Sequence, residues 1–205
     1  MRTCLLLALF ASVVTATPVS TVLIKNVGVP LASNGYYVAP YTLLVGSTLT
    51  SGMCIDYPDP GWIGDTWTAY LSYVDQDLSD TYHPGGTVKY KEAAWLFEQI
   101  LQPKSDRIGI QGAAWSLFDP AFKTSSTESA ATWLKEAALD YSSGDYSKLQ
   151  IVSSVNGTHQ QEFIIVDPPP TTAGETPEPA TVALLGGAFT TLAFVRVGCR
   201  VFRRS

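Results

Sequence analysis

Residues 66–74 read TWTAYLSYV, and the change of pattern that follows them decides the fold class. Apolar or aromatic side chains recur at every second position from Trp67 to Tyr73, which is the period of a β-strand. From residue 89 to residue 141 the period changes to that of amphipathic helices. The strand pattern returns at residue 149, so the sequence predicts a block of helices inserted between strands.

The helical block divides into three predicted helices, over residues 89–101, 106–118 and 125–141. Each carries its apolar residues on one stripe, as expected of a helix that packs against a core. Pro103 and Pro120 follow the first two helices and stop them. Ser125 and Glu128 have the spacing of a capping box at the start of the third.

Strands are predicted on both sides of the helices, from runs rich in β-branched and aromatic residues. They cover residues 19–26, 35–45, 47–55 and 66–74 before the helices, and 149–155 and 162–166 after them. Pro40 breaks the second run into either two short strands or one strand with a bulge. Asn156-Gly157 predicts a hairpin between the last two strands. The expected fold is α+β, a sheet or sandwich-like body with a cluster of about three inserted helices.

The first residues of the chain have the composition of a secretion signal. Arg2 precedes a short apolar run, and small residues follow it up to Ala16, so a signal peptide is predicted over residues 1–16. Three further segments are expected: the α+β domain, an extended linker rich in Pro and Thr, and a membrane and sorting tail, over residues 17–170, 171–179 and 180–205.

The tail has three successive parts: a Pro-Glu-Pro motif, an apolar run and a basic end, made by Pro177, Glu178 and Pro179, by residues 180–195, and by Arg200, Arg203 and Arg204. This order resembles the PEP-CTERM sorting signal of diderm bacteria. The resemblance implies an exported protein that a C-terminal helix holds in the inner membrane. An exosortase-type enzyme would then process the tail, which leaves the protein at the cell surface or outside the cell.

The chain is acidic, with a formal net charge of −5 and a sequence pI of ≈ 4.9. Several of its arginines lie in the tail, so the domain itself is more acidic than the total suggests. This charge argues against a nucleic-acid partner. The acidic stretch over residues 75–80 lacks the Gly and the Glu that a calcium loop requires, and no metal site or cofactor is predicted.

Cys54 is the one cysteine of the expected domain, because Cys4 falls in the signal peptide and Cys199 in the tail. It has no partner for an internal disulfide, so it is either a buried inert thiol or a thiol with a specific role. A protease-like pair with His83 is a further alternative, although neither neighbourhood matches a cysteine-protease signature.

Gln111 lies on the second predicted helix, and Trp115 is one turn further along the same surface. Such a Gln is either a satisfied buried amide or a surface residue. Beside Cys54 a third interpretation arises, in which the thiol displaces ammonia from the amide and forms an internal thioester. This bond requires that the two side chains meet and that water is kept out, and Trp115 and Trp95 are the candidates for shielding it.

Three short segments carry a resemblance that favours the thioester. Residues 53–56 (MCID), 93–96 (AAWL) and 110–115 (IQGAAW) resemble the thioester domains of bacterial surface adhesins. In that family a Cys near a strand end pairs with the Gln of a Gln-x-Ala-x-Trp helix motif. The resemblance implies a cross-link between Cys54 and Gln111 that an amine on a partner opens.

The sequence therefore predicts an exported surface or matrix protein that attaches covalently to an amine-bearing partner, in a single-use reaction and not as an enzyme. The alternative is a non-covalent structural or polysaccharide-binding matrix protein without a thioester. Four aromatic residues are relevant to the choice between these functions, because their rings either stack on sugars or belong to the core. They are Tyr36, Tyr37, Tyr57 and Trp62. A place in the core is expected for them.

Overall fold

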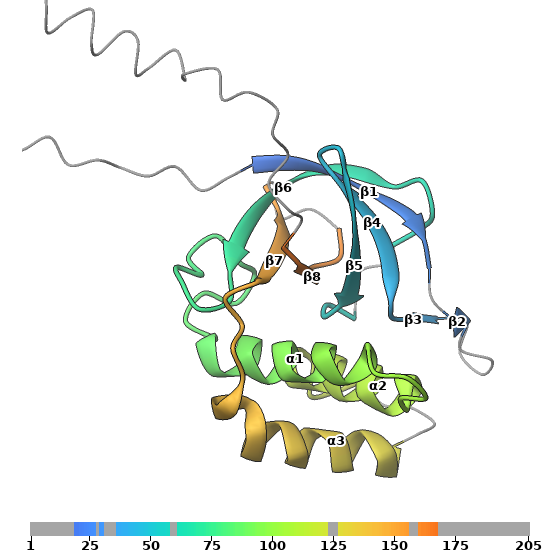
Figure 1. The fold of residues 1–205 in the computed structure, drawn as a ribbon, viewed down its shortest axis with the longest axis vertical. Helices are drawn as coiled ribbons and strands as arrows, with labels where there is room; N and C mark the ends of the chain where they lie inside the picture. Colours follow the sequence, from blue (N-terminus) through green and yellow to red (C-terminus); the bar gives the residue numbers. More distant parts are fainter. Residues whose placement is uncertain are drawn as a thin grey trace, which may run out of the picture. The chain divides into compact units, whose positions relative to one another are not determined.

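Six strands of this chain form one antiparallel sheet that closes on itself (Figure 1). The computed structural model describes residues 19–27, 29–30, 36–57, 61–122, 127–155 and 160–167. The barrel strands are β1 (Val19–Asn26), β4 (Tyr41–Val45), β5 (Thr48–Cys54), β6 (Thr66–Tyr73), β7 (Leu149–Ser154) and β8 (Phe163–Val166). Their order around the barrel is β1-β4-β5-β8-β7-β6.

The α+β class is confirmed, but the expected sheet or sandwich-like arrangement is a closed barrel. Closure occurs at β1, where Val22 pairs with Val45 of β4 on one side and with Trp67 of β6 on the other. The run over residues 35–45 forms two short strands, of which β3 (Tyr37–Val38) pairs with β2 (Val29–Pro30) outside the barrel. The predicted turn at residues 156–157 lies outside the described residues, although β7 and β8 pair antiparallel as a hairpin requires.

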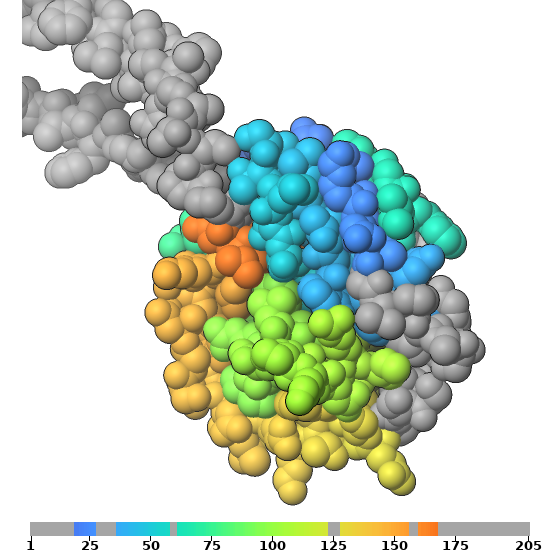
Figure 2. All heavy atoms as spheres, turned by 45° about the vertical axis from the view of Figure 1, so that its right-hand side comes forward, coloured from blue at the N-terminus to red at the C-terminus, as the bar shows by residue number. Residues whose placement is uncertain are grey.

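Three helices are inserted between β6 and β7, as predicted: α1 (Thr87–Ile100), α2 (Arg107–Phe118) and α3 (Thr127–Asp140), followed by the short 3₁₀ helix η1 (Tyr141–Ser143). In Figure 1, α1 and α2 lie below one end of the barrel, and α3 lies on their far side. Figure 2 shows this contact as a continuous surface, in which blue and cyan strands meet the yellow-green helices directly.

The barrel interior follows from the period of the strands, because neighbours in register point to the same side. The buried side chains on this side include Val22, Ile24, Leu43, Val45, Ala69, Val152, Phe163 and Ile165. Met53, Ile151 and Ile164 point to the opposite side, yet they are also fully buried. Strands β5, β7 and β8 are thus covered on both faces, and burying each large aliphatic side chain contributes about 1.5–3 kcal/mol.

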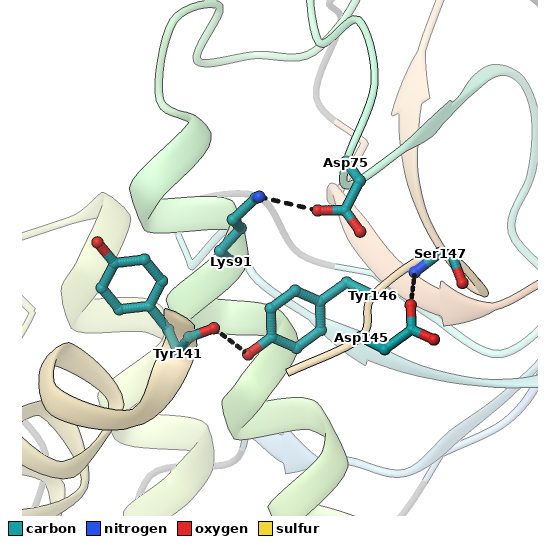
Figure 3. A network of polar contacts seen from close by, with 6 residues as sticks. All are labelled: Asp75, Lys91, Tyr141, Asp145, Tyr146 and Ser147. Carbon is teal, nitrogen blue, oxygen red and sulfur yellow. Dashed lines mark hydrogen bonds and ion pairs between the residues drawn. The ribbon is translucent and has the colours of Figure 1, made fainter. Parts of the chain in front are cut away.

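Two hydrogen bonds and one ion pair lie around α1 and the start of β7 (Figure 3), and one of these hydrogen bonds runs from the Ser147 N–H to the Asp145 carboxylate at 3.1 Å. The buried Tyr146 donates its hydroxyl to the Tyr141 carbonyl at 2.7 Å, and this contact fixes the chain where it leaves η1. Lys91 on α1 pairs with Asp75 at 2.9 Å, although both groups are partly solvated. A pair of this kind contributes about 1 kcal/mol or less. The acidic stretch after β6 is therefore tied to α1 through Asp75.

Among the described residues, no helix has the length and apolar content needed to cross a bilayer. The predicted signal peptide, the Pro-Glu-Pro motif and the membrane tail all lie outside the described residues.

Asp106 joins α2 to α3. Its carboxylate caps α2 by accepting from the Gly109 N–H at 3.1 Å, and it also accepts from the Ser129 hydroxyl and from the Trp133 indole at 3.2 Å. Partial burial alone would raise the pKa of this carboxyl, but these hydrogen bonds lower it overall. Gly109 is required beside it, because a Cβ there would lie 2.2 Å from Ser129 Oγ and 2.3 Å from Asp106 Oδ2.

We expect Asp106→Ala to lower the free energy of unfolding by about 1–2 kcal/mol, since the helix loses its N-cap. Urea unfolding monitored by circular dichroism measures the change. Asp106→Asn is the control, because its side-chain oxygen still caps the Gly109 N–H. A loss with Asn as large as the loss with Ala would contradict the capping role.

Candidate functional site

Cys54 is the last residue of β5, at the end of the barrel that faces the helices. Its backbone pairs with Phe163 of β8, and its side chain is 0% exposed. The thiol donates to the Asp56 carbonyl at 3.0 Å, a contact that orients the sulfur. Burial raises the pKa of the Tyr41 hydroxyl, and the nearby Cys54 thiol raises it further. The predicted position of the cysteine, at a strand end, is confirmed.

Gln111 is presented by α2, which packs against β5 and β3. Its side chain is 0% exposed and both amide atoms are hydrogen-bonded. Oε1 accepts from the Ala39 N–H at 3.0 Å, and Nε2 donates to the Cys54 carbonyl at 2.7 Å. A backbone donor on one side and a backbone acceptor on the other fix which amide atom is which. Of the two uses predicted for a Gln here, the satisfied buried amide is the one observed.

The two residues of the predicted cross-link therefore meet, although 57 positions separate them in the chain. The amide of Gln111 lies against the residue whose thiol would attack it. The Ala39 N–H points at the amide oxygen, where it would stabilise negative charge that develops as a nucleophile adds to the amide carbon. A thiol, a polarised carbonyl and a buried setting are the elements that formation of an internal thioester requires.

An aromatic cluster covers this pair. Trp115 is almost fully buried, one turn beyond Gln111 on α2. Its ring contacts Phe122, Tyr57 and Tyr36, with centroid separations of 5.2, 5.5 and 6.1 Å. Tyr57 and Phe122 are themselves 4.3 Å apart, so the rings form a continuous layer. Trp115 thus has the position that shielding requires.

Trp95 has a different environment from the one that shielding would need. It lies on α1, half-buried, with its ring 6.1 Å from that of Trp133 on α3. The described contacts of Trp95 connect it to the helical layer and not to Cys54. A shielding role for Trp95 stays a prediction, and this geometry does not favour it.

Burial raises the pKa of the Cys54 thiol to about 12, so the thiol is protonated at neutral pH. The Trp115 indole and the backbone at Asp56 oppose this rise by favouring the thiolate. The indole N–H makes no well-formed hydrogen bond with the described residues, and it is close enough to the sulfur to lower the thiol pKa. It is therefore a donor that can stabilise charge on this sulfur.

The alternative pair of Cys54 and His83 finds no support in the geometry. The His83 ring lies against Phe118, with centroids 5.0 Å apart, and burial lowers the pKa of its imidazole. Its backbone N–H donates to the Tyr90 hydroxyl. None of its described contacts reaches Cys54.

Glu162 is a buried group near the site that the sequence did not reveal. Its carboxylate accepts from the Tyr82 N–H at 2.9 Å, from the Tyr90 hydroxyl at 2.7 Å and from the Ser153 hydroxyl. Its backbone carbonyl accepts from the Ile55 N–H, directly beside Cys54. Burial raises its pKa to about 7, although these hydrogen bonds oppose the rise. One signal was available, since a lone Glu opens an otherwise apolar strand.

A pocket of ≈ 90 Å³ lies near Cys54, although neither Cys54 nor Gln111 lines it. Tyr41 and Trp115, which border Cys54, also line this pocket. Its other described lining residues are Tyr36, Tyr37, Tyr57, Gly61, Trp62 and Gln161. The expectation that the aromatic residues belong to the core is wrong for two of them, because Trp62 is 62% exposed and Tyr36 is 39% exposed. Their rings form the rim of the pocket.

We expect the stability contribution of Glu162 to fall as the pH rises. Its pKa is raised from 4.5 to about 7 in the folded chain, so folding favours the protonated form. This contribution is complete below pH 4.5 and is lost as the pH rises to 7.

Urea unfolding at several pH values between 4 and 8 tests this, with Glu162→Gln as the comparison. The variant has no ionisable group here, so its stability should decline less across that window. Parallel curves for the two proteins would refute the assignment.

Comparisons with family models, with curated proteins and with solved structures found no match for this chain.

Proposed function

We propose that this chain is an exported surface or matrix protein whose Cys54 and Gln111 form an internal thioester, and that the thioester captures an amine-bearing partner covalently. The observation that carries the proposal is the contact of Gln111 Nε2 with the Cys54 carbonyl at 2.7 Å, inside a region that excludes water. The resemblance of the three short motifs to adhesin thioester domains supports the same pairing.

Thioester formation proceeds by addition of the Cys54 sulfur to the Gln111 side-chain carbon. The S–C bond forms, the C–N bond breaks, and ammonia leaves with the proton of the thiol. The Ala39 N–H stabilises the oxygen during this step. The high pKa of the thiol, about 12, makes this step slow at neutral pH and faster as the pH rises.

Capture reverses the roles of sulfur and nitrogen. A primary amine adds to the same carbon, a new amide forms, and the sulfur leaves as a thiol carrying a proton from the amine. The Trp115 indole lies where it stabilises charge on the departing sulfur. Each molecule reacts once, so the protein acts as a covalent adhesin-like module and not as an enzyme.

The remaining parts of the proposal concern the ends of the chain, which lie outside the described residues. A signal peptide over residues 1–16 directs export, and the sorting tail holds the protein in the inner membrane until an exosortase-type enzyme acts on the motif at Pro177, Glu178 and Pro179.

The alternative function is non-covalent binding, and the exposed aromatic rim favours it as a second candidate. Trp62 and Tyr36 are exposed aromatic residues that line a pocket, an arrangement that suits polysaccharide. Binding to glycans that is unchanged in Cys54→Ala, from a chain that contains no thioester, would establish this alternative.

We expect the purified chain to be lighter by one ammonia than its sequence implies. Intact mass spectrometry tests this against Cys54→Ala and Gln111→Ala, each processed in the same way and each expected at its full calculated mass. Methylamine should add one methylamine to the wild type and release one thiol that alkylates. A wild type at full mass, with a thiol at Cys54, would refute the proposal.

We also expect Trp115→Leu to shorten the life of the thioester in amine-free buffer, because the aromatic layer over the bond opens. Hydrolysis adds one water, which mass spectrometry follows with time. Trp95→Leu is the matched control and should hydrolyse at the wild-type rate, since Trp95 packs against Trp133. Equal acceleration in both variants would contradict the assignment of the shield to Trp115.

A further inference from the structure

One buried acceptor beside the proposed thioester has no donor. Gln161 is 8% exposed, and its Oε1 atom has no hydrogen-bond partner among the described residues. A buried polar atom in this state costs about 1–3 kcal/mol, so such atoms commonly mark a place where a ligand completes the contact. Gln161 lines the pocket that also contains Trp115.

The pocket connects this acceptor with the reacting pair. Gln161 directly precedes Glu162, and the Glu162 carbonyl accepts a hydrogen bond from the Ile55 N–H. Gln161 is therefore close to the end of β5 that contains Cys54. Trp115 is shared by the pocket and by the cover over Cys54. A molecule that reaches Gln161 Oε1 through the pocket therefore contacts Tyr41 and Trp115, the two lining residues that also border Cys54.

The lining of the pocket indicates the chemistry of that molecule. Faces of Trp and Tyr rings attract an ammonium group, and an unpaired amide oxygen accepts one of its N–H bonds. A volume of ≈ 90 Å³ limits the bound group to a few non-hydrogen atoms. These three features together fit a small primary alkylamine.

We propose that Gln161 is the positioning residue for the attacking amine, and that the pocket rimmed by Trp62 and Tyr36 is the site where a small primary alkylamine binds before it reacts. The inference rests on the proposed thioester and names the residue that selects its partner. The amine donates one N–H to Gln161 Oε1. The bound ammonium first releases one proton to water. Its nitrogen then forms the new C–N bond at the thioester carbon as the C–S bond breaks, and the departing sulfur of Cys54 takes the second proton that the nitrogen loses.

Gly61 is part of this arrangement. A Cβ at position 61 would lie 2.6 Å from Gln161 Oε1, so a side chain there would displace the acceptor. The absence of a side chain at this position allows Gln161 to keep its place at the pocket wall.

The test measures aminolysis of the wild-type thioester against n-butylamine concentration, with Gln161→Leu, Gln161→Glu and Gln160→Leu as variants. Gln161→Leu should raise the half-saturating concentration about tenfold, with little change in the maximal rate, because it removes one hydrogen bond to a charged donor. Gln161→Glu keeps an acceptor and should retain saturation. Gln160→Leu, at the neighbouring position, should behave as wild type.

Hydrolysis in amine-free buffer separates positioning from structure. If Gln161→Leu speeds hydrolysis as much as it alters aminolysis, the residue merely supports the fold and the inference is overturned. An unchanged half-saturating concentration in Gln161→Leu overturns it as well.

A second measurement tests amine binding in the pocket independently of thioester formation. Cys54→Ala cannot form the thioester but keeps the pocket, and Trp62 and Trp115 line that pocket, so their fluorescence reports n-butylamine binding. Binding that weakens about tenfold on adding Gln161→Leu supports the pocket even if the wild type contains no thioester. Absence of binding in Cys54→Ala, with a wild-type thioester that reacts without saturation, overturns the pocket and leaves the thioester standing.

Discussion

The amide of Gln111 is the contact on which the junction between barrel and helices depends. It satisfies the backbone N–H of Ala39 and the backbone carbonyl of Cys54, two groups from different parts of the chain that have no water around them. Leaving either group unpaired would cost about 1–3 kcal/mol. The same pair of hydrogen bonds fixes the amide beside Cys54. The stability of the junction and the proposed chemistry thus depend on the same amide. A substitution of Gln111 would therefore affect both.

Burial imposes opposite demands at this site. Exclusion of water protects a thioester once it has formed, but it also raises the pKa of the thiol that must form it. The Trp115 indole reduces the conflict, because it belongs to the hydrophobic cover and still has an N–H donor near enough to the sulfur to lower the thiol pKa. Glu162 shows the same conflict nearby, since its carboxyl is buried with hydroxyl and amide donors around it and has a pKa raised to about 7. At the end of the barrel that faces the helices, aromatic and aliphatic side chains therefore exclude water from the Cys54 thiol and the Glu162 carboxyl.

Local features of the fold could be predicted from the sequence, and features that depend on distant pairing could not. A run of β-branched residues placed β1 at Val19–Asn26 with its observed bounds, and helical periodicity placed the three helices to within a few residues. Closure of the barrel depends on β1 pairing with both β4 and β6, and the side-chain period carries no information about such partners.

The candidate site was likewise predicted only in part from the sequence. The motif around Gln111 identified its partner, whereas Trp95 was expected at the site because of its residue type, and its helix turns it toward Trp133. Gln161 and Glu162 were not predicted to lie near the site, because their burial depends on the tertiary structure.

The pairing of the two buried residues distinguishes a covalent from a purely structural interpretation. Gln111 alone has a sufficient structural role, because its amide completes two backbone groups. Cys54 alone is a small buried side chain whose thiol makes one weak hydrogen bond, to Asp56, and a non-reactive residue of similar size would fill the same space. Packing gives no reason for a cysteine at the position that this amide contacts, whereas a thioester requires both residues. The unpaired Gln161 Oε1 in the aromatic pocket supports the same interpretation. In a purely structural protein this acceptor would only lower the stability of the fold, whereas in the proposed reaction it binds the amine.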